Sequence, residues 1–253
     1  MINLIKQENF KLLKKRSTFI IPLIIIALMI LQALLLKNYV PPKILLESNF
    51  GGAFWVTLLL IIQSSTIITM EFHYGTIKNI LYRNSSRKNI ILSKILILAI
   101  YSLIYFAITI VFSLILCAIF YHDISIFSNI GNELSLFNQM LLGTLGCYIG
   151  TWLVLSITLL ISCAMNRSEI SIAVGIVFFL ITSLLSSILA MAIDRWPWLK
   201  WGPINMMNIT SQISDHSLKA TTKLELHELV LGNIFYIIIF LMLVVFVFKK
   251  KNV

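Results

Sequence analysis

Six long segments without a single charged residue dominate this chain and limit what it can fold into. They lie at about 19–36, 50–70, 95–118, 139–163, 170–193 and 229–248. Each is close to the ~20 residues with which a helix crosses a ~30 Å hydrocarbon layer. Hydrophobic residues make up 59% of the chain and charged residues only 12%. The sequence therefore predicts an all-α integral membrane protein with six transmembrane helices, a single multi-pass domain of residues 1–253 in the cell (plasma) membrane.

The third apolar segment differs from the others because a lysine lies close to its start. From 90 to 120 the chain is apolar apart from Lys94 and scattered serine, threonine and tyrosine residues. This run is too long for one straight crossing, so the predicted span begins after Lys94. A lysine can lay its aliphatic stem along apolar surface while its ammonium group reaches water. We therefore expect Lys94 at the cytoplasmic interface.

Lysine and arginine collect on one side of the predicted spans. With the N-terminus in the cytoplasm, fourteen of the twenty Lys and Arg residues fall in cytoplasmic segments, and seven of the ten acids fall outside. Cytoplasmic loops of membrane proteins are enriched in Lys and Arg. We predict that both termini are cytoplasmic. The net charge of +10 then reflects topology, and no nucleic-acid partner is predicted.

Residues 1–16 precede the first span and form a basic, weakly amphipathic helix. Apolar residues fall roughly on one side and lysines mostly on the other: Ile2, Ile5, Leu12 and Leu13 against Lys6, Lys11, Lys14 and Lys15. Such a helix is typical of segments that lie flat at a membrane surface. The alternative is a solvated basic arm.

The segment 71–94 is the most crowded polar stretch of the chain. Tyr74, Ile77, Ile80 and Leu81 are spaced as one apolar side of a helix. The turn that follows, 84–86, ends in serines, and a serine there can cap the next helix. Charged residues surround the apolar ridge and are expected at its rim: Glu71, Lys78, Arg83 and Arg87.

Two groups of neutral polar residues interrupt the predicted spans. They are Gln63, Ser64 and Thr66 in the second span, and Thr182, Ser183 and Ser186 in the fifth. Polar groups in hydrocarbon face protein or a water-filled path. They either form hydrogen bonds between helices or line a translocation path. Gly146 and Gly150 form a GxxxG pattern in the fourth span, which predicts close helix packing.

The longest polar loop, 194–228, carries three tryptophans near its start. Trp196, Trp198 and Trp201 lie close to Pro197 and Pro203. Tryptophan is enriched at membrane–water interfaces. Two interpretations remain: a re-entrant or interfacial helix, or an ordinary aromatic belt just past a span.

Several motifs of soluble enzymes are missing. The chain has no G-x-x-x-x-G-K-[ST] sequence and so no phosphate-binding loop. His227-Glu228 opens like a zinc-protease motif, but Leu231 stands where the second histidine is required. Cys117, Cys147 and Cys163 lie in apolar runs without metal-binding spacing. We predict no enzymatic activity, no metal and no cofactor in this chain.

Together these features resemble the permease subunit of a type 2 ABC exporter. Residues 1–16 resemble the elbow helix of that family, and 71–94 (EFHYGTIKNILYRNSSRKNIILSK) resembles its coupling segment. The match rests on an acid followed by Gly-Thr, a short helix, a basic turn and a lysine at the next span. The tryptophan loop resembles the outer re-entrant helices. The layout is most similar to the branch serving lantibiotic immunity and export of toxic amphipathic peptides.

The resemblance implies several partners: a separate cytoplasmic ATPase subunit carrying ATP and Mg²⁺, a second permease chain, identical or similar, the lipid bilayer and an amphipathic, antimicrobial peptide as substrate. It also implies which residues couple to the ATPase, namely Glu71, Tyr74, Gly75, Thr76, Ile77, Lys78, Ile80, Leu81, Arg83 and Arg87. Helix-in-groove docking fits the apolar ridge, although the same ridge would also suit lipid headgroups.

Two other functional classes remain as alternatives. A self-contained secondary transporter or channel typically shows charges or broken helices at the membrane midplane. Here the only proline inside a predicted span is Pro22. A membrane scaffold or sensor without transport activity is the third hypothesis. A nucleotide-hydrolysing partner would distinguish the exporter from both.

Overall fold

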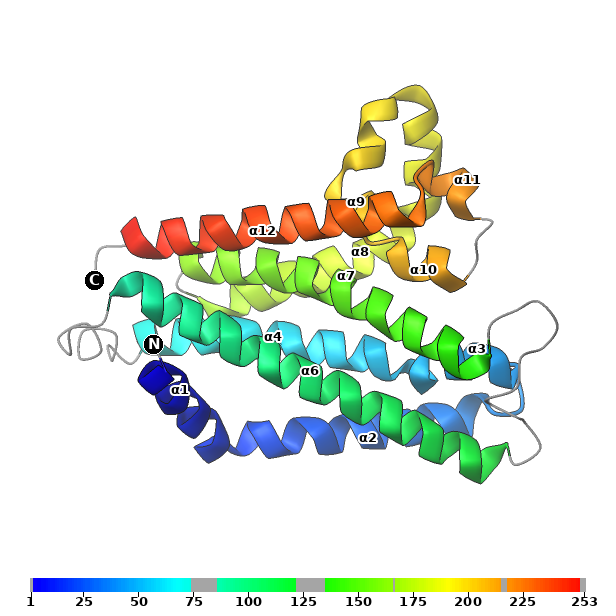
Figure 1. Cartoon of the computed structure of the whole chain (residues 1–253), viewed down its shortest axis with the longest axis horizontal. Helices are drawn as coiled ribbons and strands as arrows, with labels where there is room; N and C mark the ends of the chain where they lie inside the picture. Colours follow the sequence, from blue (N-terminus) through cyan, green and yellow to red (C-terminus); the bar gives the residue numbers. More distant parts are fainter. Residues whose placement is uncertain (1, 74–85, 122–134, 166, 215–217, 251–253) are drawn as a thin grey trace.

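A computed structural model describes residues 2–73, 86–121, 135–165, 167–214 and 218–250. Within these residues every regular element is a helix. The long helices run side by side as a bundle (Figure 1): α2 (Arg16–Leu36), α4 (Gly52–His73), α6 (Arg87–Phe120), α7 (Leu136–Met165), α8 (Ser168–Arg195) and α12 (Leu226–Lys250). Helix α7 lies at the centre and packs against α4, α8 and α12.

The all-α membrane prediction is confirmed, whereas the count of six spans is not. In the described part of the chain, five helices are long and apolar enough to cross a membrane: α2, α4 with the turn before it, α6, α7 and α12. Helix α8 is continuous over 28 residues, and its described side chains are apolar over Ser168–Thr182, so a sixth span at α8 stays a prediction. The described N-terminal residues and the end of α12 lie at the same end of the bundle (Figure 1). The cytoplasmic orientation of that end stays a prediction.

Helix α6 begins before the predicted start of the third span, which itself stays a prediction. It is continuous over 34 residues, about 51 Å at 1.5 Å per residue. Ser86 caps it as expected: its Oγ accepts a hydrogen bond from the Asn89 amide at 3.3 Å. Lys94 lies inside this helix and is only 2% exposed, so its ammonium group does not reach solvent as expected. Its ammonium group is neutralised within the protein instead.

The connection between α2 and α4 is a compact turn that the sequence did not predict. It contains α3 (Pro42–Glu47) and the 3-10 helix η1 (Asn49–Gly51). Asn49, Phe50 and Gly51 all adopt positive φ. The Phe50 side chain is fully buried, and Gly51 lies so close to Gln32 that a Cβ atom would overlap its side chain. Burial of the aromatic ring offsets the strained backbone.

Four short helices follow α8: η2 (Pro197–Trp201), α9 (Pro203–Met206), α10 (Ile209–Ser214) and α11 (Lys219–Thr222). Helices α9 and α10 pack against α12, and α10 also packs along α7. The GxxxG residues of α7 receive this packing, since a Cβ on Gly146 would lie 2.5 Å from Ile213 Cδ1. The close approach predicted for this pattern is therefore present, with α10 rather than another long span as the neighbour.

Candidate functional site

The site begins with α1 (Ile2–Lys14), which crosses one end of the bundle at an angle to α2 (Figure 1). The expected division into an apolar side and a lysine side is met only in part. Leu12 and Glu8 are buried toward α4 and α6, whereas Leu13 and Phe10 are exposed. The departure arises because α1 turns Glu8 inward, where it pairs with the buried Lys94 and the half-exposed Lys11.

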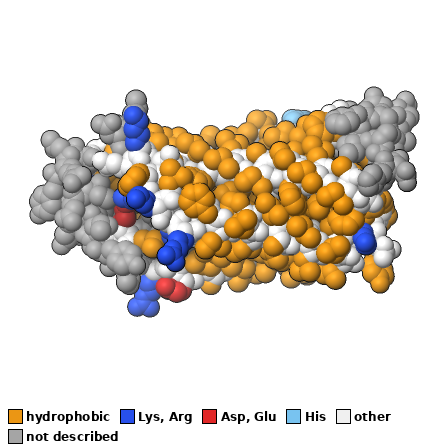
Figure 2. All heavy atoms as spheres, turned by 90° about the horizontal axis from the view of Figure 1, so that it is seen from below, with side chains coloured by type: hydrophobic (Ala, Val, Ile, Leu, Met, Phe, Trp, Pro, Cys, Tyr) orange, Lys and Arg blue, Asp and Glu red, His pale blue; other side chains and the backbone are white. Residues whose placement is uncertain are grey.

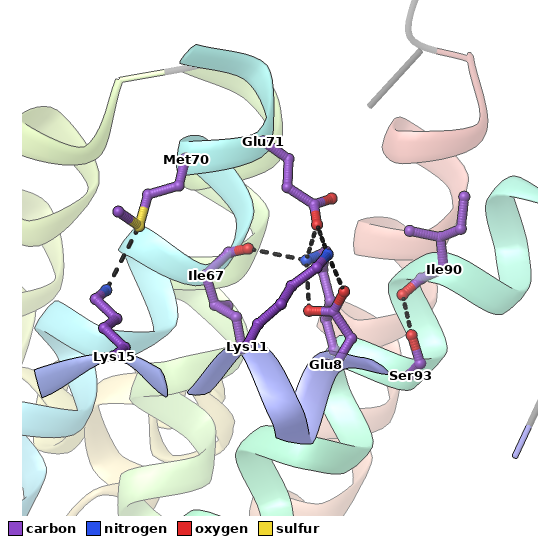
Figure 3. A network of polar contacts seen from close by, with 9 residues as sticks. Glu8, Lys11, Lys15, Ile67, Met70, Glu71, Ile90 and Ser93 are labelled. Atoms are coloured by element: carbon purple, nitrogen blue, oxygen red, sulfur yellow. Dashed lines mark hydrogen bonds and ion pairs between the residues drawn. The ribbon is translucent and has the colours of Figure 1, made fainter. Parts of the chain in front are cut away.

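Four charged side chains from three helices meet where α1 packs against α4 and α6 (Figure 3). We name this group the charged junction: Glu8 and Lys11 of α1, Glu71 of α4 and Lys94 of α6. Lys94 Nζ lies 3.0 Å from Glu8 Oε2 and 2.8 Å from Glu71 Oε1. Lys11 Nζ lies 2.7 Å from Glu8 Oε1 and 2.9 Å from Glu71 Oε1. Lys94 also donates a hydrogen bond to the Ile67 carbonyl at 3.1 Å.

Burial makes these contacts strong and mutually dependent. The side chains of Glu8 and Glu71 are 8% and 9% exposed, and two carboxylates face two ammonium groups. Burial raises the pKa of Glu8, but Lys94 and Lys11 outweigh it, so that the pKa lies below its ordinary value. Burial lowers the pKa of Lys11, and its bonds to Glu8 and Glu71 outweigh this, so that the pKa is raised. Both shifts favour the ionised network.

Further contacts attach α1 to the same two helices. Tyr101 of α6 donates a hydrogen bond to Asn9 Oδ1 at 3.0 Å. Just after α1, Lys15 Nζ lies 3.4 Å from the Met70 sulfur of α4. Among the described residues, Glu71 Oε2 has no hydrogen-bond partner. The junction therefore fixes α1 to the last turns of α4 and the first turns of α6, the two helices that flank residues 74–85.

The predicted coupling residues are placed only in part. Glu71 belongs to the charged junction, and Arg87 donates a hydrogen bond to the Lys249 carbonyl at the end of α12, at 3.2 Å. The other members lie outside the described residues: Tyr74, Gly75, Thr76, Ile77, Lys78, Ile80, Leu81 and Arg83. Their role in coupling stays a prediction.

Sequence reasoning did not select Glu8, Lys11 or Lys94 as site residues. Two signals pointed to them. Glu8 is the only acid before Glu47, and Lys94 is the only charged residue of the apolar run 90–120. A lysine in an apolar run is costly unless it is paired, so an acid elsewhere in the chain is the expected counter-ion.

The predicted translocation-path residues do not form one described cluster. Ser64, Thr66 and Thr182 each donate a hydrogen bond to a carbonyl of their own helix. Gln63 is buried, and its Oε1 has no partner within the described part of the chain. The side chains of Ser183 and Ser186 lie outside the description.

Contacts between helices come from other hydroxyl groups. Thr57 and Thr151 join α4 to α7 at 2.7 Å, and Ser162 donates to Ser65 at 3.3 Å. These bonds hold the centre of the bundle together.

The outer tryptophans are exposed, at 49% for Trp196, 71% for Trp198 and 46% for Trp201. Cationic groups lie over two of the rings, Arg195 over Trp196 and Lys200 over Trp201. Exposed aromatic rings beside cations suit an interface between apolar and polar surroundings. Their location relative to a membrane stays a prediction.

Behind the tryptophans, buried amides hold the short helices to the bundle. Asn233 of α12 donates to the Met206 carbonyl at 2.7 Å, and Gln212 donates to the Leu224 carbonyl at 2.9 Å. Asn205 donates to the Thr222 carbonyl at 3.0 Å. Side-chain amides thus satisfy backbone groups that irregular structure would otherwise leave unpaired.

A comparison with protein families agrees with this architecture. A family model described as "ABC-2 family transporter protein" matches residues 4–195, from α1 to the end of α8. No curated protein matches the chain. The family consists of membrane components of ABC transporters, which generally lack an ATPase site of their own, and membership implies an ABC ATPase as partner. Because the match covers about three quarters of its length, this chain belongs to the ABC-2 family of transporter proteins.

Proposed function

We propose that this chain is the permease subunit of an ABC exporter that moves amphipathic or antimicrobial peptides out of the cell. A separate ATPase subunit supplies ATP hydrolysis, with its own ATP and Mg²⁺. A second permease chain completes the path. Membership of the ABC-2 family supports the permease assignment, and the charged junction carries the proposal of coupling.

The argument for coupling rests on where the junction lies in the chain. Glu71 comes three residues before the segment 74–85, and Lys94 lies in the second turn of the helix that begins just after it. Both side chains also hold α1 through Glu8 and Lys11. A force applied to residues 74–85 would therefore act on α1, α4 and α6 together. Docking of the ATPase on the ridge of Tyr74, Ile77, Ile80 and Leu81 would apply that force.

The apolar character of the predicted spans supports the proposed substrate class. The six apolar segments carry no charged residue. Phe54 of α4, 41% exposed, contacts Phe179 of α8 at a ring-centroid distance of 5.4 Å. An apolar, partly aromatic surface favours amphipathic molecules that already partition into the membrane, since charged solutes would find no partner along it.

The coupling proposal is tested with the full chain and its co-purified ATPase. The double variant Tyr74→Asp, Leu81→Asp places two acids on the predicted ridge. We expect loss of ATPase association and of transport, with the helical content unchanged. A matched control, Tyr39→Asp with Ile44→Asp, adds two acids at exposed positions at the other end of the bundle. Normal transport by the ridge variant would show that residues 74–81 do not couple the subunits.

The substrate proposal needs its own assay. Inside-out vesicles that contain the complex are supplied with ATP and a labelled amphipathic cationic peptide, and uptake is measured against vesicles without ATP. We expect ATP-dependent uptake. ATP hydrolysis that no such peptide stimulates, in a complex of intact composition, would exclude the substrate class while leaving the permease assignment in place.

A further inference from the structure

Helix α1 has a second face that the charged junction does not use. Lys6, Phe10, Leu13 and Lys14 occur at the i, i+4, i+7 and i+8 positions and so lie on one side of the helix. All four are exposed, with Phe10 at 61% and Leu13 at 47%. We name these four residues the outward face of α1.

The outward face carries positive charge that nothing nearby on α1 neutralises. Glu8 is the only acid of the helix, and it is buried between Lys94 and Lys11 in the charged junction. Lys14 Nζ lies 5.3 Å from the centre of the Phe10 ring. The ammonium group of Lys14 therefore lies next to the Phe10 ring. A cation beside an aromatic ring suits the boundary between headgroups and hydrocarbon.

The position of the outward face follows from its connection to α2. Helix α2 begins at Arg16, and its exposed apolar side chains start almost at once, with Phe19 at 60%, Ile20 at 47% and Leu23 at 66%. Figure 2 views the molecule from the side on which α1 and α2 lie. There, lysine and arginine side chains gather at one end, at the margin of a broad apolar surface.

We propose that the outward face of α1 binds anionic phospholipids at this end of the bundle. Phe10 and Leu13 enter the region between headgroups and acyl chains, and Lys6 and Lys14 contact the lipid phosphates. Charge complementarity selects this occupant: two lysines with no acid on the same face of α1, beside two apolar side chains and a helix with exposed apolar side chains, match an anionic membrane surface. The inward face of α1 would then hold the protein core while the outward face holds lipid.

The test uses the full chain in proteoliposomes of phosphatidylcholine and phosphatidylglycerol. After mild solubilisation, the ratio of the two lipids that co-purify is compared with the ratio in the starting membrane. The wild-type chain is expected to enrich phosphatidylglycerol. In Lys6→Gln, Lys14→Gln the enrichment should fall about fivefold or more, because each lysine near an anionic surface contributes about fivefold. Lys6→Arg, Lys14→Arg should retain it.

A matched control separates local binding from total charge. Lys219→Gln with Lys223→Gln removes the same charge from the short outer helices, where these lysines pair with Glu225 and Asp194. This control should keep the wild-type enrichment. Equal enrichment in the wild-type chain and the Lys6, Lys14 variant would overturn the proposal, as would an equal fall in the control.

A second measurement addresses a protein ligand for the same face. ATPase association is measured on the same preparations. If the Lys6, Lys14 variant loses the ATPase subunit but keeps its phosphatidylglycerol, the outward face docks protein and the lipid proposal is wrong. The lipid measurement needs no ATPase, so its failure would leave the proposed permease function unaffected.

Discussion

Replacement of Lys94 by methionine is the sharpest perturbation of the charged junction. Methionine has a similar length and no charge, and it leaves Glu8 and Glu71 with only Lys11 as a counter-ion. Lys94 is 2% exposed and lies within 3.0 Å of both carboxylates. Removal of one member of a buried ion pair typically costs about 3–5 kcal/mol, because the remaining charge stays buried. We expect a loss of this size in the free energy of unfolding.

A double-mutant cycle tests whether this cost arises from unpaired charge. Glu8→Gln alone leaves two ammonium groups with one carboxylate, whereas Glu8→Gln with Lys94→Met leaves the neutral pair of Lys11 and Glu71. The double variant should therefore lose at least about 1 kcal/mol less than the sum of the two single losses. Lys219→Met is the control, since its pair with Glu225 is 56% and 49% exposed and should contribute no more than about 1 kcal/mol.

The assay is unfolding of the purified chain by a denaturing detergent, followed by circular dichroism. Amide hydrogen exchange of residues 4–14 reports separately on release of α1. Lys94→Met should lower protection of α1 more than protection of α7. A Lys94→Met cost no larger than that of Lys219→Met would refute the argument, and so would strict additivity in the cycle.

Three further outcomes follow from the structure. First, the pKa of Glu8 is lowered from 4.5 and that of Lys11 is raised from 10.5, so the junction stabilises α1 fully between these values. This stability should be lost as the pH falls through the lowered pKa of Glu8 or rises through the raised pKa of Lys11. The melting temperature is measured against pH, and an unchanged fall at acidic pH in Glu8→Gln would contradict this. Second, Gly146→Leu should displace α10, because even a Cβ there lies 2.5 Å from Ile213; proteolysis of the outer loop should accelerate, and unchanged cleavage would show that the contact is dispensable. Third, Asn233→Leu removes two buried hydrogen bonds, to the Met206 and Leu229 carbonyls, and should cost about 1–3 kcal/mol; the same unfolding assay checks it, with no loss as the contrary result.

Hydropathy explains why the long helices could be found from the sequence. A bilayer requires every backbone group of a span to be paired within it, so an uncharged run of about 20 residues must be helical. The serine cap of α6 could be predicted for a similar reason, since capping depends on residues only a few positions apart. The close packing at Gly146 could also be predicted, but its partner could not, because small residues accept any neighbouring helix.

Lys94 shows where this local information stops. Its position in an apolar run allows two outcomes: extension to water, or burial with a counter-ion. The sequence does not choose between them, because the acids that decide it lie 86 residues away in Glu8 and 23 residues away in Glu71. The inward turn of Glu8 on α1 has the same cause. An amphipathic pattern gives the spacing of side chains around a helix but not which side meets the protein.

The sequence alone thus determined the class of the protein, the positions of its long helices and the resemblance to ABC exporter permeases, because hydrophobic length and charge bias act locally along the chain. Only the tertiary structure decided which charges pair. Ion pairs form where helices distant in sequence approach within about 3–4 Å, and the bundle sets that geometry. The charged junction, and with it the division of α1 into an inward and an outward face, is a property of the folded bundle.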